Sequence, residues 1–173
     1  HVLGVQRLKL YMDPDRPASE LERAAYRDLV ERALADEPVD YLVGHAPFFS
    51  MVFKVSPAVL VPRPSTETLV EHVLQHARRT PGFESPTVAD VCTGSGAIAV
   101  SLARQFKRDK TPATVVASDL YEDALAILLQ NSSPSLFAER CGISGVEEEE
   151  VAVDVFSGSD IFYVFIFIYF FKL

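Results

Sequence analysis

One short segment constrains the fold of this chain more than any other: a predicted strand that runs into a glycine-rich turn and then into a predicted helix. Residues 87–91 read as a short apolar strand, Gly94 and Gly96 follow, and an apolar helix is predicted over residues 97–106. Glycines here let the backbone approach a ligand closely, and the helix amino terminus behind them offers unpaired N–H groups. This order is typical of a nucleotide-binding loop in an α/β fold.

The alternation of strand and helix continues towards the carboxyl end. A second strand is predicted over residues 114–118, a helix over 122–130 and a third strand over 151–156. Strand, helix, strand, helix and strand in this order are typical of half of a doubly wound parallel sheet. We therefore predict a Rossmann-like α/β fold for this part of the chain.

The first 40 residues are predicted to be helical. Ser19 and Glu22 have the spacing of a capping box, in which the serine hydroxyl accepts from the third helical N–H and the glutamate reaches back. Apolar residues at helical spacing follow along residues 21–34, and Pro38 ends the segment. An amphipathic helix is therefore expected here.

Short apolar runs replace this helical pattern over residues 46–62. Ser56 and Pro57 separate the runs, and the pattern predicts a β-hairpin. Pro62-Arg63-Pro64 then forces an extended connection, and a second amphipathic helix follows with Ser65 as its predicted cap. The residues predicted to be buried on that helix are Leu69, Val70, Val73, Leu74 and Ala77.

Composition and spacing argue against several classes of function. A formal net charge of −8 argues against broad, salt-driven binding of nucleic acid, which needs a basic face. Two cysteines, Cys92 and Cys141, cannot make a disulfide framework, so a reducing compartment is expected. His72 and His76 are four residues apart on the second amphipathic helix, but no third ligand has useful spacing, so we expect no metal site.

No association with a membrane is expected either. Residues 161–171 form an unbroken run of eleven apolar residues. At 1.5 Å per residue a helix of that length reaches only about half of a bilayer core. Arg7, Lys9 and Asp13 interrupt any apolar run at the start of the sequence, so no secretory signal is predicted.

Two kinds of ligand fit the glycine-rich turn. The pattern Gly94-x-Gly96-x-x-Ala99 matches a relaxed dinucleotide fingerprint, which makes a nicotinamide cofactor a candidate. Asp90, four residues before Gly94, would repel a pyrophosphate but attract the ammonium group of S-adenosylmethionine, which has no phosphate. We therefore favour S-adenosylmethionine. The alternative, that Asp90 only caps the loop, stays open.

A further acidic residue supports a nucleoside-containing ligand. Asp119 is predicted to end the next strand, 23 residues after Gly96. A carboxylate in that position can accept hydrogen bonds from both hydroxyl groups of a ribose.

Several motifs together resemble the HemK-type release-factor glutamine methyltransferases, over about 150 residues from Arg7 to Phe156. The strongest match is Asp90–Leu102. The order of the proline-arginine-proline segment and the glycine loop is a specific signal, because a generic methyltransferase would match the loop alone. The matching stretches are Glu37–Gly44, Phe53–Val55, Leu60–Glu67, Asp90–Leu102, Ser118–Leu120 and Val153–Phe156.

The resemblance implies a domain organisation and a reaction. It implies a partial amino-terminal helical substrate-recognition domain (1–44), a β-hairpin linker (45–64) and the first half of a Rossmann-like methyltransferase domain (65–157). The implied reaction transfers a methyl group from S-adenosylmethionine to the side-chain nitrogen of the glutamine in the Gly-Gly-Gln motif of a translation release factor. A cytoplasmic protein is expected, with a mitochondrial or plastid one as the alternative.

The same resemblance implies the residues of the cofactor site. The methionine part would contact Asp90 and the following loop, the ribose would contact Asp119, and Asp154 with Val155 would border the adenine. Cys92 departs from the family, which usually has glycine there, and its Cβ is expected to narrow the loop. The complete set is Asp90, Cys92, Thr93, Gly94, Ser95, Gly96, Asp119, Asp154 and Val155.

The family's substrate clamp, Asn-Pro-Pro-Tyr, is absent from this sequence, in which Asn131 is the only asparagine. We therefore assign no catalytic residue and expect the chain to be inactive as written, with an aberrant aromatic tail over 158–173. The alternative for the tail is a genuine segment that packs as a strand. The alternatives for the function are a non-catalytic remnant that binds the partner, and a nucleic-acid amino-methyltransferase.

Overall fold

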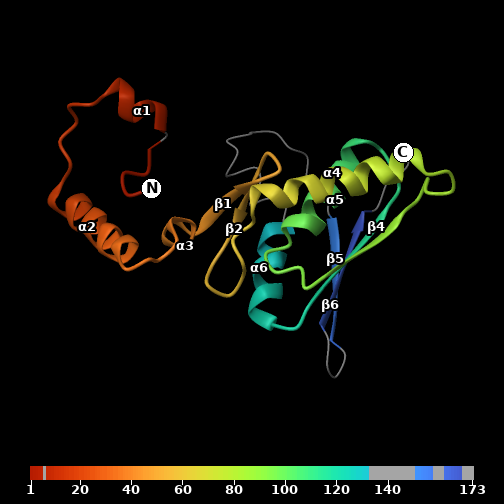
Figure 1. Cartoon of the computed structure of the whole chain (residues 1–173). Helices are drawn as coiled ribbons and strands as arrows, with labels where there is room; N and C mark the ends of the chain where they lie inside the picture. Colours follow the sequence, from red (N-terminus) through yellow and green to blue (C-terminus); the bar gives the residue numbers. More distant parts are fainter. Residues whose placement is uncertain (6, 133–150, 158–161, 169–173) are drawn as a thin grey trace. The chain divides into compact units, whose positions relative to one another are not determined.

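The structure is a computed structural model that describes residues 1–5, 7–132, 151–157 and 162–168 (Figure 1). Contacts divide the chain into two compact units, His1–Gly44 and His45–Leu173.

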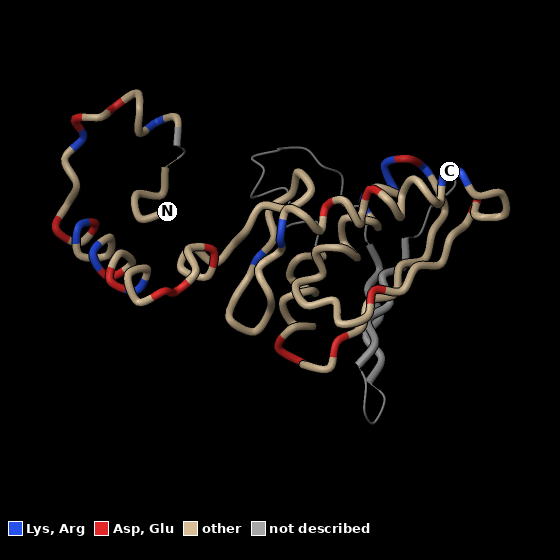
Figure 2. Tube along the Cα trace, in the orientation of Figure 1, with Lys and Arg blue, Asp and Glu red and all other residues tan. Residues whose placement is uncertain are grey.

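The first unit contains three helices: α1 (Arg7–Met12), α2 (Glu20–Leu34) and α3 (Val39–Val43). The predicted capping box is confirmed, because the Ser19 hydroxyl accepts from the Glu22 N–H at 3.2 Å and the Glu22 carboxylate accepts from the Ser19 N–H at 2.7 Å. Acidic and basic residues are interspersed along α2 (Figure 2). No residue of α2 is buried, and Leu21 and Leu34 of its apolar stripe are about four-fifths exposed.

A hairpin opens the second unit, but its turn is not where the sequence pattern predicted it. Strands β1 (His45–Phe48) and β2 (Met51–Lys54) pair antiparallel. The turn falls at Phe49 and Ser50, whose φ angles of 48° and 59° lie in the left-handed region that such two-residue turns require. The expected break at Ser56-Pro57 is therefore wrong: that segment lies after the hairpin and is not in a strand.

Helix α4 (Pro64–Arg79) follows the hairpin. Its cap is Arg63 rather than the predicted Ser65, because Pro64 occupies the first helical turn, where its fixed φ angle suits the helix and its missing N–H costs nothing. Val70 and Leu74 are buried as predicted, whereas Leu69 is about half exposed and does not belong to the buried face.

The larger sheet is mixed rather than parallel throughout. Its order is β3-β4-β6-β5, and among the described strands β3 and β4 are the only neighbours that pair parallel. The strand predicted over residues 151–156 is confirmed as β5 (Val151–Ser157), and it runs in the same direction as β3 and β4. The prediction of a sheet that is parallel throughout is wrong, because β6 lies between β4 and β5 and pairs antiparallel with both. The elements of this part are β3 (Thr87–Val91), α5 (Ala97–Arg108), β4 (Thr114–Asp119), α6 (Glu122–Ser132), β5 (Val151–Ser157) and β6 (Phe162–Ile168).

The core lies between one face of this sheet and the helices α4, α5 and α6. Residues of β3 alternate, so that Val88 is half-buried on the helix-covered side while Ala89 and Val91 are exposed on the other. Val115 and Ala117 of β4 are fully buried. The alternation agrees with a sheet that packs its helices on one face.

The fold places the glycine-rich turn at the carboxyl ends of the parallel pair β3 and β4.

Among the described residues, no helix is long and apolar enough to cross a membrane.

Candidate cofactor-binding site

The loop between β3 and α5 has three residues in the left-handed region of backbone conformation. Cys92, Gly94 and Gly96 have φ angles of 60°, 56° and 76°. The Thr93 N–H donates to the Ser118 carbonyl at 2.9 Å, which ties the loop to β4. The Gly96 N–H donates to the Thr93 carbonyl at 2.9 Å and closes the turn. The loop is therefore a set of tight turns, fixed at the carboxyl ends of the parallel strands β3 and β4.

Asp90 both supports this loop and leaves one carboxylate oxygen available. Its Oδ2 accepts from the Thr93 hydroxyl at 2.6 Å and from the Ala99 N–H at 3.1 Å, so the loop-capping role left open by the sequence is present. Among the described residues, its Oδ1 accepts no hydrogen bond. One oxygen thus shapes the loop while the other remains free to meet a cation.

Burial raises the pKa of Asp90, because removal from water disfavours the charged carboxylate. The hydrogen bonds from Thr93 and Ala99 oppose this effect, and the negative charge of Asp119 adds to it. The two carboxylates are therefore close enough to interact. A cation bound between them would relieve both the burial cost and the repulsion.

Asp119 ends β4 and is almost completely buried, with 8% of its surface exposed. Its Oδ2 accepts from the Gly94 N–H at 2.8 Å, and its Oδ1 accepts from the Tyr121 N–H at 3.1 Å. The sequence pattern missed this support for the loop. Each carboxylate oxygen has a second lone pair, which is what acceptance from the two hydroxyl groups of a ribose requires.

The two glycines of the loop differ in what surrounds them. A Cβ atom on Gly94 would have no atom within 4 Å, so one side of the loop is open. A Cβ atom on Gly96 would lie 2.1 Å from Leu128 Cδ1 of α6. Gly94 therefore leaves room for a ligand, whereas Gly96 lets α6 pack close to the loop.

The remaining loop residues divide into exposed and buried. Cys92 is exposed. Cys92 therefore lowers the stability of the protein through its left-handed backbone conformation rather than through crowding by its side chain. Thr93 and Ser95 are buried, with 9% and 3% of their surfaces exposed. Their contribution to a ligand site would come through the backbone.

Asp154 and Val155 lie on β5, and their side chains are outside the described residues. In the sheet, β6 separates β5 from β4. Asp154 is opposite Phe165, which in turn is opposite Val116, three residues before Asp119. Asp154 and Val155 therefore do not lie on a strand adjacent to the one that carries Asp119. Their contact with adenine stays a prediction.

One polar residue near the loop was missed altogether. The side chain of Asn131, near the end of α6, donates to the Ser95 carbonyl at 2.8 Å. Its signal in the sequence is positional: Leu128 is buried on α6, and a residue three positions later lies on the same helix face.

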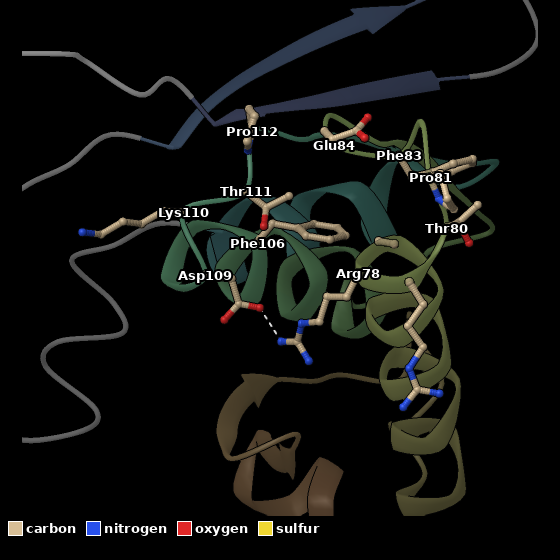
Figure 3. Close-up of a pocket in the computed structure, with 12 residues that line it drawn as sticks. Arg78, Thr80, Pro81, Phe83, Glu84, Phe106, Asp109, Lys110, Thr111 and Pro112 are labelled. Atoms are coloured by element: carbon tan, nitrogen blue, oxygen red, sulfur yellow. Dashed lines mark hydrogen bonds and ion pairs between the residues drawn. The ribbon is translucent and has the colours of Figure 1, made fainter.

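A separate cavity of about 470 Å³ lies away from this loop (Figure 3). The end of α4, the end of α5 and the segments that precede β3 and β4 surround it, and Phe106 and the ion pair of Arg78 with Asp109 are part of its wall. Because parallel strands begin at this end, the cavity is remote from the loop at their carboxyl ends. None of the predicted site residues contributes to it.

Within the described part of the chain, no three His, Cys, Asp or Glu residues are grouped as a metal site would need. His76 instead lies edge-on to the Phe83 ring, with a centroid distance of 5.3 Å. Cys141 lies outside the described residues.

Comparisons with known proteins agree with the sequence motifs. Residues 1–44 match the family described as PrmC N-terminal domain. The release factor glutamine methyltransferase of Chlorobaculum tepidum is 39% identical over 142 residues, which are 81% of this chain and 47% of that protein.

Two further relatives with the same name give similar values. The protein from Koribacter versatilis is 42% identical over 131 residues, 76% of this chain and 44% of its own length. The protein from Moorella thermoacetica is 47% identical over 103 residues, 60% of this chain and 34% of its own length. The chain spans about half the length of most of the relatives that it matches. By these matches, residues 1–44 belong to the family described as PrmC N-terminal domain, and most of the chain is similar to release factor glutamine methyltransferases over about half of their length.

Proposed function

We propose that this chain provides the cofactor-binding part of an S-adenosylmethionine-dependent methyltransferase that acts on the glutamine of a release factor. The observation that carries the proposal is Asp90: its Oδ2 shapes the glycine loop, while its Oδ1 accepts no hydrogen bond among the described residues. A carboxylate beside an open glycine loop suits a cationic amino acid better than a pyrophosphate. When bound, S-adenosylmethionine would supply a methyl group activated by its positively charged sulfur.

Each residue of the loop has a proposed part in holding this cofactor. Asp90 binds the ammonium group, and the backbone from Cys92 to Gly96 surrounds the methionine part. Asp119 accepts hydrogen bonds from the ribose hydroxyls with the lone pairs that Gly94 and Tyr121 leave unused. Asp154 and Val155 border the adenine. The dinucleotide alternative is disfavoured because the Asp90 carboxylate would lie beside its phosphates.

We also propose a fold for the part of the chain that carries the glycine loop. The segment β3-α5-β4-α6 is the amino-terminal part of a Rossmann-like domain, with the cofactor at the carboxyl ends of its parallel strands, as is usual for open α/β sheets. The hairpin of β1 and β2 is the linker that precedes it.

We further propose that the helical unit, residues 1–44, recognises the release factor. The match of these residues to the PrmC N-terminal domain and the name shared by the relatives support this assignment. The exposed apolar residues of α2, including Leu21 and Leu34, are available for a contact.

The sequence has no Asn-Pro-Pro-Tyr motif, so we assign none of its residues to the glutamine amide. We expect the chain to bind both cofactor and release factor without transferring the methyl group. The test mixes the purified chain with a purified release factor and S-adenosylmethionine. It then measures co-elution by size-exclusion chromatography and the mass of the Gly-Gly-Gln peptide.

The two readouts test separate parts of the proposal. Co-elution with an unmodified glutamine is the expected result. Failure to co-elute would overturn the partner assignment and leave the cofactor assignment standing. A methylated glutamine would show that this chain positions the substrate amide by residues other than the absent motif.

A further inference from the structure

Asn131 connects two segments that are far from it, and from each other, in the sequence. Its side chain reaches the end of β2 at Lys54, 77 residues earlier, and the glycine loop at Ser95, 36 residues earlier. The Lys54 N–H donates to Asn131 Oδ1 at 2.7 Å, while Asn131 Nδ2 donates to the Lys54 carbonyl at 3.0 Å and to the Ser95 carbonyl at 2.8 Å.

The three hydrogen bonds require the chemistry of an amide. One end of the group must accept from a backbone N–H while the other donates to two carbonyl oxygens. Aspartate at this position could accept from Lys54 but could not donate to Ser95. An aliphatic residue of the same size would leave three backbone groups in a partly buried place without partners.

We infer that Asn131 is a positioning residue that joins the carboxyl end of the hairpin to the glycine loop. Order in one of these two segments then stabilises the conformation of the other. The inference rests on the proposed function, because it assigns the loop to the cofactor. Ser95 is almost completely buried and Gly96 packs against Leu128 of the same helix, so the loop is fixed to α6 at two successive residues.

A measurable coupling follows from this arrangement. If the cofactor orders the loop, the Ser95 carbonyl keeps its position and its hydrogen bond from the Asn131 amide. The Asn131 side chain is then fixed and continues to accept from the Lys54 N–H. Binding at the loop should therefore protect the Lys54 N–H from hydrogen exchange. By reciprocity, loosening this link should weaken cofactor binding.

The test compares the whole chain with two variants. Asn131→Asp keeps the acceptor for the Lys54 N–H and removes the donor to the Ser95 and Lys54 carbonyls. Gln130→Ala is the matched control, because the Gln130 side chain accepts a hydrogen bond from the Lys54 ammonium group and, among the described residues, none joins it to the loop. The measurements are the dissociation constant of S-adenosylmethionine by calorimetry, and amide exchange at Lys54 and Gly96 with and without this ligand.

We expect S-adenosylmethionine to protect the Lys54 N–H in the unaltered chain. In Asn131→Asp, we expect the affinity to fall about tenfold and this protection to disappear, because a lost hydrogen bond of this kind corresponds to about one decade in an equilibrium constant. Gln130→Ala should keep both. Without ligand, the Gly96 N–H should exchange faster in Asn131→Asp than in the control.

The possible failures are distinguishable. If the unaltered chain does not bind S-adenosylmethionine, the proposed function fails, whereas faster exchange at Gly96 without ligand still supports the link. Unchanged affinity together with unchanged Gly96 exchange in Asn131→Asp would overturn the inference. If that variant does not fold, the measurement at Lys54 in the unaltered chain decides: protection by the ligand supports the link, and its absence overturns it.

Discussion

At the scale of single residues, Asp90 is where stability and binding oppose each other. Its carboxylate is partly removed from water and lies near the negative charge of Asp119, and both effects raise its pKa. An uncharged side chain of the same shape would avoid this cost, since asparagine can also accept from Thr93 and Ala99. Because the pKa is raised on balance, burial and Asp119 outweigh the stabilisation of the charge by the two hydrogen bonds, and a charge of this kind suits a site that binds a cation.

Replacement of Asp90 by asparagine tests this directly. Asp90→Asn should lower the affinity for S-adenosylmethionine by about tenfold to a hundredfold, because a hydrogen bond to a charged group is lost. The free energy of unfolding at neutral pH should stay the same or rise. Calorimetry and urea denaturation measure the two quantities, and a variant that binds as tightly as the unaltered chain would contradict the assignment of Asp90.

The raised pKa also predicts two opposite dependences on pH. From the ordinary value of 3.8 up to the raised value, the unfolded carboxyl loses its proton while the folded one retains it, so the free energy of unfolding should fall as pH rises through this interval. Affinity for the cofactor's ammonium group should rise over the same interval, as Asp90 becomes charged. Both dependences should be weaker in Asp90→Asn; an unchanged pH profile in that variant would assign them to another group.

Cys92 gives a second prediction at this scale. Its φ angle of 60° is unfavourable for a residue with a Cβ atom. Cys92→Gly should therefore be more stable than Cys92→Ala by about 1 kcal/mol, since the alanine variant keeps the backbone strain. Thermal unfolding of the two variants measures the difference, and equal stability would show that the loop conformation costs nothing.

At the scale of elements, the packing of α6 against the loop depends on Gly96. Gly96→Ala should destabilise the protein by about 3 kcal/mol, because the new methyl group meets Leu128 and the φ angle of 76° is unfavourable. Gly94→Ala is the matched control, with a similar φ angle and no atom nearby, and should cost about 1 kcal/mol.

A double-mutant cycle separates packing from backbone strain in this prediction. In a Leu128→Ala background the methyl group of Gly96→Ala has room, so the same substitution should cost about as much as Gly94→Ala. Urea denaturation gives the four free energies of unfolding. Strict additivity of the two substitutions would show that α6 does not lie as close to the loop as described.

Elements with strong local patterns were predictable, and those that depend on distant partners were not. The periodicity of residues 87–91 and 97–106 identified β3 and α5 almost residue for residue. The hairpin turn was misplaced because Phe49 and Ser50 carry no common turn signal. The pairing of β6 between β4 and β5 could not be predicted, because the choice of a strand's neighbours is not encoded in its own periodicity.

At the scale of the whole molecule, the candidate site was predictable as far as it lies in one continuous segment. The loop from Asp90 to Gly96 has a recognisable spacing, and Asp119 follows at the end of the next strand. The hydrogen bonds from the Gly94 N–H to Asp119 and from the Asn131 amide to the Ser95 carbonyl span 25 and 36 residues. These hydrogen bonds depend on how β4 and α6 pack, and no local sequence pattern predicts them.

Calorimetric titration of the chain with S-adenosylmethionine and, in parallel, with NAD shows whether the glycine loop binds the cofactor that we propose. We expect saturable binding of S-adenosylmethionine at one site, weaker binding in Asp90→Asn, and no binding of NAD. Binding of NAD, or no saturable binding of S-adenosylmethionine by the folded chain, would contradict the proposal.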